Sequence, residues 1–290
     1  MSPQVIVNGL LLGGLYAAVG VGFSLVWGVM NVINITHGSF LMLGAYVSYW
    51  LFRLYHVDPF LSLPAVMLLM FGLGYLLQRY IVNAVVKTGV FMTLIITYGM
   101  NLFFVNLALL LWKGDYRSVT PEYAGTGLQI GGLIIPYIRL VAAVLAVVLT
   151  LLLQLFLSRT RVGNAILATA LNKNAAQLVG IPIGRIYAIT YGIGAALAGA
   201  AGALMSAIYV ITPFMGEPFI GKAFVVACLG GLGTATGAIL GGVVLGLAET
   251  IGGAIVGPSY QEAISFIVLV LILIVRPEGI IGRRFFAEVK

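Results

Sequence analysis

The sequence predicts an all-α polytopic membrane bundle of about eight transmembrane helices, with one half-helix and discontinuous segments. Of the 290 residues, 61% are hydrophobic and only 8% are charged, whereas a soluble domain carries about 25% charged residues. The first 52 residues contain no Asp, Glu, Lys or Arg. The apolar stretches are continuous rather than alternating, which favours helices over a β-barrel. This composition excludes a water-soluble enzyme and a disordered chain.

Each expected helix is an apolar stretch close to the length that crosses a membrane. About 20 residues are needed for the roughly 30 Å hydrocarbon layer. The stretch 223–232 is too short to cross, and we expect a half-helix there. We treat residues 1–290 as one domain. The expected helices are 4–29, 38–54, 60–78, 90–112, 133–157, 186–211, 235–256 and 260–275.

The basic residues orient the chain, because cytoplasmic loops of membrane proteins carry an excess of Lys and Arg. Ten basic residues fall on one side of the expected helices and five on the other. We place the richer side and the C-terminus in the cytoplasm, and the N-terminus outside. The net charge of +7 is then a property of these loops and not a nucleic-acid surface. The richer side holds Arg79, Lys87, Arg159, Arg161, Lys173, Arg185, Arg276, Arg283, Arg284 and Lys290; the other holds Arg53, Lys113, Arg117, Arg139 and Lys222.

Two polar or glycine-rich interruptions, at 30–38 and 229–237, are candidates for the path of a transported molecule. Lipid cannot satisfy unwound backbone, so such a segment must face protein or water, and broken helices in transporters mark the substrate path. Their helix N-termini would offer N–H groups to a carboxylate. The alternative is a surface loop at each position. The residues assigned to the path are Asn34, His37, Gly38, Gly230, Gly231, Gly233, Thr234, Thr236, Gly237 and Glu249.

Single ionisable residues in apolar stretches carry less specific information. Glu249 could face a wet cavity, lie near the outer interface or bind the ammonium group of a zwitterion. His37 is expected to cap the broken helix by hydrogen bonding, and neither it nor Cys228 makes a metal site alone. The stretch 216–223 resembles a phosphate-binding loop, but Ala223 replaces the hydroxyl residue and no strand precedes it. We therefore expect no metal or cofactor bound directly to this chain.

Small residues recur every four positions in several expected helices, as in Gly194, Ala198, Gly202 and Ser206. The chain has 38 glycines, and such stripes let helices approach closely in lipid. Close packing is the simpler interpretation; sliding of helices during transport is the other.

The loop 158–185 has an amphipathic pattern that predicts one or two short cytoplasmic helices, ended by Gly180 and then Pro182. Its stretch 174–180, NAAQLVG, resembles the EAA-x-x-x-G signature of ABC importer permeases, with Asn174 in place of Glu. In that family this loop is the coupling helix that docks on the ATPase. The resemblance implies coupling roles for Ala168, Leu171, Asn174, Ala175, Ala176, Leu178 and Gly180.

The resemblance extends over nearly the whole chain. The stretches 31–38 (NVINITHG), 44–46, 161–163, 223–233 (AFVVACLGGLG), 237–238 and 276–279 (RPEG) are similar, in order, to the branched-chain amino acid (leucine/isoleucine/valine) ABC permeases, and closer to the LivH-like subunit. This implies a non-enzymatic transporter subunit in the inner membrane of a bacterium. The implied partners are a second homologous permease (or a second copy), two ABC ATPases that bind ATP and Mg, and a periplasmic binding protein. The family also covers carriers of urea, short amides and aromatic acids.

Two other classes of membrane protein fit the sequence less well. A standalone ion-coupled carrier or channel would need paired membrane carboxylates or a filter. Glu249 is the one carboxylate inside the expected span 235–256. An intramembrane enzyme would need a catalytic constellation within the spans, and the sequence offers none.

Overall fold

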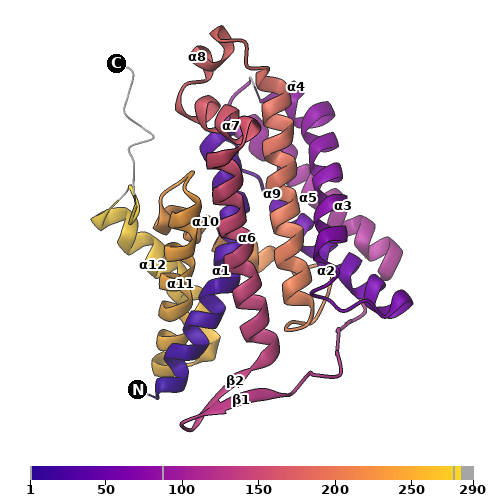
Figure 1. Ribbon diagram of the computed structural model, residues 1–290, viewed down its shortest axis with the longest axis vertical. Coiled ribbons are helices and arrows are strands. Elements are labelled where there is room, and N and C mark those ends of the chain that lie inside the picture. Colours follow the sequence, from indigo (N-terminus) through magenta and orange to yellow (C-terminus); the bar gives the residue numbers. More distant parts are fainter. Residues whose placement is uncertain (1, 87, 277, 282–290) are drawn as a thin grey trace.

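The computed structural model describes residues 2–86, 88–276 and 278–281, and it is a bundle of helices with one short hairpin at one end (Figure 1). Seven stretches in it are long and apolar enough to cross a membrane. The expected all-α polytopic bundle is confirmed. The long helices are α1 (Pro3–Met30), α2 (Thr36–Tyr55), α3 (Leu63–Leu77), α5 (Val90–Trp112), α6 (Tyr137–Arg159), α9 (Ile183–Ser206), α11 (Ala235–Val256) and α12 (Gln261–Val275). The shorter elements are a π-helical turn (Gln78–Val82), α4 (Asn83–Val85), β1 (Gly127–Ile130), β2 (Leu133–Pro136), α7 (Arg161–Leu171), α8 (Lys173–Leu178), α10 (Glu217–Gly230) and a 3₁₀ turn (Pro258–Tyr260).

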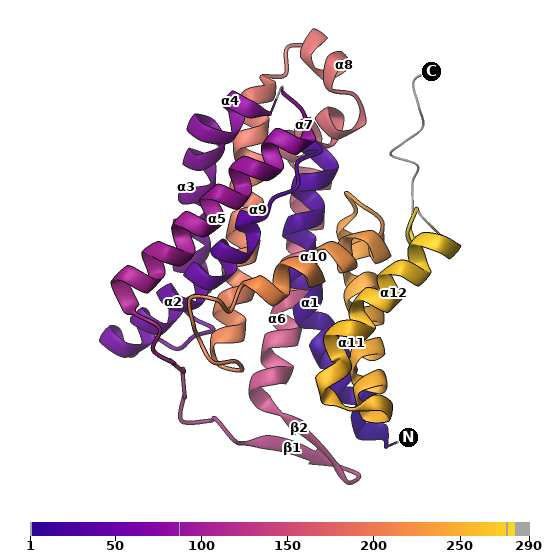
Figure 2. The same ribbon diagram turned by 180° about the vertical axis from the view of Figure 1, so that it is seen from behind.

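Helices α1 and α9 form the centre of the bundle and are almost entirely buried, whereas α3, α5, α6 and α12 expose most of their apolar surface. In both ribbon views α12 lies at one edge, and α3 and α5 lie at the other (Figures 1 and 2). A helix that is apolar on all sides must be buried in protein or lie in lipid. The exposed helices therefore present a surface suited to lipid or to other membrane subunits.

The small-residue stripes are packing surfaces, as the simpler interpretation predicts. A Cβ on Gly202 would clash with the carbonyl oxygen of Leu41, and one on Gly242 or Gly246 would meet the backbone of Gly13. The α1–α11 and α2–α9 crossings therefore depend on the missing side chains. Small side chains leave room for this close approach, and dispersion contacts between the backbones then replace contacts with lipid.

Two helix boundaries differ from the sequence prediction. The helix expected from residue 133 begins at Tyr137, because Leu133–Pro136 pairs antiparallel with Gly127–Ile130. Gly131 and Gly132 both have positive φ (55° and 81°) and make the tight turn between the strands. The helix expected over 186–211 ends at Ser206, and Ile211 instead forms an isolated bridge with Arg117.

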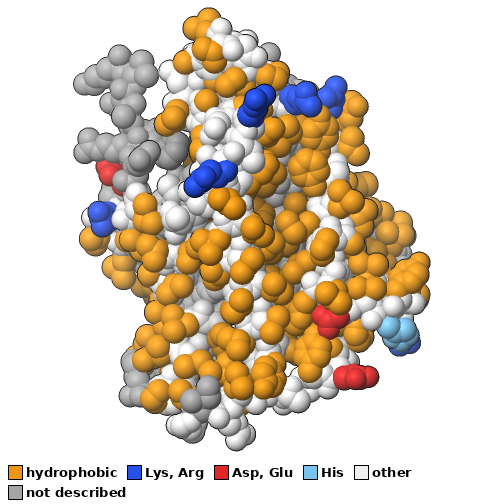
Figure 3. Space-filling view, in the orientation of Figure 1, with side chains coloured by type: hydrophobic (Ala, Val, Ile, Leu, Met, Phe, Trp, Pro, Cys, Tyr) orange, Lys and Arg blue, Asp and Glu red, His pale blue; other side chains and the backbone are white. Residues whose placement is uncertain are grey.

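The two ends of the bundle differ in charge. The N-terminus of α1 lies at the end that carries the hairpin, opposite α7 and α8 (Figure 1). Lys and Arg side chains gather at the α7–α8 end in the space-filling view (Figure 3). Those that are exposed and described there are Arg79, Arg159, Arg161, Lys173 and Arg185, while Lys87, Arg283, Arg284 and Lys290 lie outside the described residues. Arg276, at the end of α12, is described and exposed as well. The assignment of the α7–α8 end to the cytoplasm stays a prediction.

The connection between α5 and the hairpin is tied to the loop between α2 and α3. The Tyr123 hydroxyl donates to Oδ2 of Asp58 at 2.6 Å, and the Tyr123 ring stacks on Phe60. Burial and this hydrogen bond raise the pKa of Tyr123, so the hydroxyl remains a donor at neutral pH. The contact fixes the surface at the hairpin end of the bundle.

Candidate functional site

Helices α2 and α10 both begin inside the bundle, where their N-termini meet. After α1 ends, the chain turns back and α2 starts partway along the molecule; α10 crosses the middle of Figure 2 and starts beside it. Gly38 and Gly216 are in backbone contact at this point, since a Cβ on either would clash with the other. The sequence predicted the second half-helix, at 223–232, but the structure extends it back to Glu217. For α2, the sequence predicted the break before the helix and a helix at 38–54, and the structure starts the helix at Thr36.

The first break is enclosed by protein: Asn31 is exposed, but the residues that follow it, 32–35, are buried or half-buried. It is therefore not a surface loop. Asn31 adopts a left-handed conformation (φ 53°), and its N–H bonds to the Trp27 carbonyl at 2.8 Å. The Thr97 hydroxyl on α5 donates to the Ile33 carbonyl at 2.9 Å. Asn34 is 1% exposed and accepts a hydrogen bond from the Tyr191 hydroxyl at 2.8 Å. Side chains of α5 and α9 thus satisfy backbone that lipid could not.

His37 connects the start of α2 to α1. Its Nε2 lies 2.8 Å from the Val19 carbonyl oxygen, and its ring packs edge-on against Phe23 at 5.7 Å. It therefore bonds to a neighbouring helix instead of capping its own. The Nδ1 atom of His37 and the Nδ2 atom of Asn34 are buried without a hydrogen-bond partner among the described residues. Two unpaired polar atoms at a helix break are a place where a water or a polar ligand group can bind.

The second break joins α10 to α11 in a glycine turn. Gly231 and Gly233 have positive φ (96° and 83°), and the Gly233 N–H donates to the Ser24 hydroxyl on α1 at 2.9 Å. The Thr234 hydroxyl donates to the Gly231 carbonyl. The backbone N–H of Ile280 donates to the Leu229 carbonyl at 2.8 Å, so the chain after α12 packs on this turn. The remaining path candidates differ in exposure: Gly230 and Gly237 are buried, and Thr236 is exposed.

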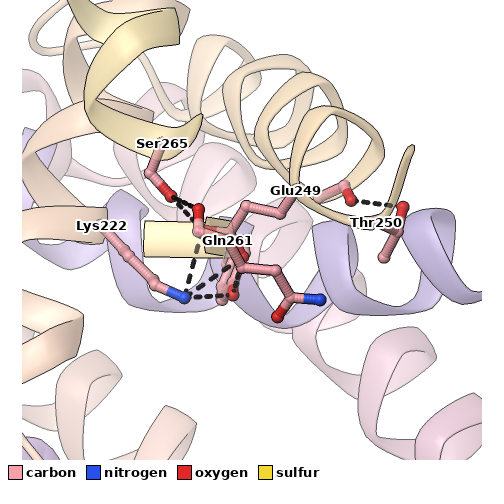
Figure 4. A network of polar contacts seen from close by, with 7 residues as sticks. Lys222, Glu249, Thr250, Gln261 and Ser265 are labelled. Atoms are coloured by element: carbon pink, nitrogen blue, oxygen red, sulfur yellow. Dashed lines mark hydrogen bonds and ion pairs between the residues drawn. The ribbon is translucent and has the colours of Figure 1, made fainter. Parts of the chain in front are cut away.

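Glu249 is the acceptor of a buried polar network that joins four helices (Figure 4). The ammonium group of Lys222 on α10 lies 3.1 Å from Oε1 of Glu249 and 2.7 Å from the Tyr16 hydroxyl on α1. The Tyr16 hydroxyl donates to Oε2 at 2.5 Å, and the Ser265 hydroxyl on α12 donates to Oε1. Glu249 is 0% exposed. Both charges are neutralised and hydrogen-bonded, which is the condition for burying an ion pair.

This network corrects the placement of Lys222 outside the membrane. Lys222 lies on the half-helix α10, and its side chain is 14% exposed. Glu249 is therefore paired with Lys222 of this chain and not with the ammonium group of a zwitterion. A single cation and a single anion in neighbouring apolar stretches were the available sequence signal, since unpaired charges are costly in a bilayer. Tyr16 and Ser265 gave no such signal, because both residue types are common in membrane helices.

The loop 158–185 forms an elbow, defined here as α7 and α8, with a cap at each boundary. The Thr160 hydroxyl accepts from the Gly163 N–H, and the Asn172 side chain accepts from the Ala175 N–H, both at 2.9 Å. Gly180 (φ 87°) ends α8: its N–H bonds to Gln177, and the N–H of Ile181 bonds to Ala176. This is the Schellman pattern, which glycine adopts without strain.

The elbow carries exposed apolar side chains at its tip. Leu171, Leu178 and Val179 are 76%, 88% and 78% exposed. Asn174, Ala175 and Gly180 are also exposed and Ala168 is half-buried, but Ala176 faces inward and is 3% exposed. The elbow therefore presents an exposed apolar tip.

Comparison with known proteins agrees with this architecture. The model of the family described as "Branched-chain amino acid transport system / permease component" matches residues 5–273. This chain belongs to that family. The permease is 33% identical over 293 residues to BraD, a high-affinity branched-chain amino acid transport system permease protein of Pseudomonas aeruginosa, covering 97% of this chain and 95% of the relative. LivH of Escherichia coli is 32% identical over 294 residues, with the same coverage. A probable LivH of Methanocaldococcus jannaschii is 25% identical over 298 residues, covering 97% and 93%. No solved structure matches the chain.

These relatives confirm the LivH-like resemblance and the transporter class. They are transport permeases and not enzymes by name. The similarity covers nearly the full length of the permease, so it includes both breaks, the elbow and the residues of the buried network. The individual roles of those residues remain predictions.

Replacing Gly237 with Ala is expected to destabilise the permease at the second break. The new Cβ would clash with the Thr234 hydroxyl and with the Gly230 carbonyl, and overpacking costs about 1–3 kcal/mol. Thermal unfolding of the purified protein in detergent measures the effect. Gly72→Ala is the matched control, because no atom lies within 4 Å of the added Cβ. Equal melting temperatures for the two variants would contradict close packing at Gly237.

Proposed function

We propose that the permease is the LivH-like membrane subunit of an ATP-driven importer, and that its substrates are branched-chain amino acids. The observation that carries this proposal is the capped elbow with its exposed apolar tip, in a chain whose full-length relatives are named for branched-chain amino acid transport. An exposed apolar tip on the basic side of a membrane protein needs a protein partner. A separate ATPase that pushes on the elbow is such a partner.

The complete transporter would contain several chains. A second homologous permease, in a heterodimer or as a second copy of this chain, would cover part of the exposed bundle surface. Two ABC ATPases would hold ATP and Mg at the elbow, on the cytoplasmic side. A periplasmic binding protein would dock at the hairpin end, where the N-terminus lies. The C-terminus would then be cytoplasmic, and the bundle would span the inner membrane of a bacterium.

The path would pass the two breaks. Docking of the liganded binding protein and closure of the ATPases would move the elbow and open the path inward. The N-termini of α2 and α10, the unpaired atoms of Asn34 and His37, and glycine backbone at 230–237 are groups that can exchange hydrogen bonds with a passing zwitterion. Apolar walls suit an aliphatic side chain. Glu249 supports the path indirectly, because it is bound to Lys222 of the half-helix.

Uptake of radiolabelled leucine by the reconstituted complex tests the proposal. We expect ATP-dependent uptake that valine suppresses and that urea and benzoate leave unchanged. Suppression by urea or benzoate instead would assign the permease to carriers of amides or aromatic acids. Uptake that persists without the ATPases would favour a standalone carrier and contradict the importer.

A further inference from the structure

A cavity of about 460 Å³ lies at the α7–α8 end of the bundle, where the two breaks and the elbow come together. Its walls include Asn31 at the first break, Leu232 at the second, and Thr169 and Lys173 of the elbow. Small-molecule sites have volumes of about 300–1,000 Å³. We propose that this cavity binds the transported aliphatic amino acid as a zwitterion, on the side to which it is released. The proposal rests on the function proposed above.

The end of α1 supplies the binding site for an ammonium group. The Asn31 N–H bonds to Trp27, which leaves the carbonyl groups of Gly28, Val29 and Met30 without a hydrogen bond from the described residues. All three residues line the cavity. The last carbonyls of a 28-residue helix carry the negative end of its dipole. A cation that enters the cavity is therefore attracted to these carbonyl groups, and lipid offers it no better hydrogen-bond acceptor.

Lys173 supplies the site for a carboxylate. It is the first residue of α8 and lines the same cavity, and its ammonium group lies 5.7 Å from the centre of the Tyr187 ring. It forms no ion pair with the described residues. In an amino acid bound between Lys173 and the end of α1, the carboxylate would meet the full positive charge of Lys173. The ammonium group of the same amino acid would meet the helix carbonyls.

The remaining walls select an aliphatic side chain. Trp27, Val29, Val86 and Leu232 are apolar, and a polar side chain would lose its hydration against them without a replacement partner. An occupant would also touch Thr169 and Lys173 of the elbow. Because the elbow must move to drive transport, an amino acid bound here opposes that movement, and the initial uptake rate falls as the internal concentration rises.

Trp27 is a reporter inside the cavity, and the chain has two other tryptophans, Trp50 and Trp112. We would replace those two with phenylalanine and titrate the complex in nanodiscs with L-leucine, without ATP or binding protein. A saturable change in Trp27 fluorescence is expected. Leucinol, which lacks the carboxylate, and 4-methylpentanoate, which lacks the ammonium group, are expected to bind at least about tenfold more weakly, since each loses a charged contact.

Lys173→Met tests the carboxylate contact separately from the ammonium contact. This variant is expected to weaken leucine binding about tenfold and to leave leucinol binding unchanged, because leucinol has no carboxylate to lose. Arg185→Met is the matched control: Arg185 is exposed at the same end of the bundle but does not line the cavity. Uptake inhibition by internal leucine, measured relative to the uninhibited rate of each variant, is expected to weaken in parallel with binding.

The outcomes distinguish this inference from the proposed function. A complex that imports leucine but shows no saturable Trp27 response overturns the cavity site and leaves the importer intact; a partner subunit that fills the cavity would give this result. Equal preference for leucine over leucinol in wild type and Lys173→Met overturns the assignment of the carboxylate to Lys173. Absence of branched-chain amino acid uptake counts against the proposed function, whatever Trp27 reports.

Discussion

Leucine uptake is expected to fall by about two orders of magnitude or more when Leu178 and Val179 are both replaced by aspartate, because apolar anchors dominate binding at protein interfaces. The two side chains are 88% and 78% exposed, so the permease loses little internal packing with them. Membrane insertion and thermal stability should match the wild type. Their exposed position makes any loss of uptake a loss of an external contact.

The matched control keeps the tip apolar. Leu178→Met with Val179→Ile is expected to support near-normal uptake. Pull-down of the ATPase by the tagged permease should fail for the aspartate variant and succeed for the control. Normal uptake by the aspartate variant, or an ATPase that still binds to it, would remove the elbow from the coupling mechanism. The structure favours these residues over Ala176, which is buried and whose replacement would disturb α8 itself.

The second large effect is expected at the buried network. Glu249→Leu leaves Lys222 without its buried partner, and breaking such a pair costs about 3–5 kcal/mol. We expect a lower melting temperature of the permease in detergent and little assembled protein. The double variant Lys222→Met with Glu249→Leu removes both charges and should recover most of this stability. A smaller loss, about 1 kcal/mol, is expected for Ser265→Ala, which removes one hydrogen bond.

Thr250→Val is the matched control for this network. Thr250 follows Glu249 on α11, but among the described residues its hydroxyl bonds only to carbonyls of its own helix. We therefore expect a small effect. A double variant as unstable as Glu249→Leu alone would mean that the loss comes from shape and not from charge, and an unaffected Glu249→Leu would contradict the network altogether.

Uptake and stability together separate two roles of the network. Because Lys222 lies on the half-helix α10 and Glu249 on α11, the pair fixes the position of α10 relative to α1, α11 and α12. If the double variant is stable but transports poorly, the charge pair positions α10 for transport. If it is stable and transports normally, the pair serves assembly only.

Local features of the fold were predictable because their causes lie within a few residues. The elbow is an example: Thr160 and Asn172 cap its two helices, and Gly180 ends the second one. The spans were predictable for the same reason, since the length of an apolar stretch decides whether a helix can cross lipid. The hairpin escaped prediction because its second strand continues the apolar composition of α6, and only pairing with β1 separates the two.

By itself, the sequence determined the fold class, the helical spans, the charged ends of the bundle and the family, because composition, stretch length and motif order are properties of the chain alone. The tertiary structure decided which distant residues meet. The meeting of Gly38 with Gly216, the pairing of Lys222 with Glu249, and the cavity between Asn31, Lys173 and Leu232 each join segments far apart in the sequence. Such contacts depend on how the glycine faces of whole helices pack, and no local pattern of residues encodes that geometry.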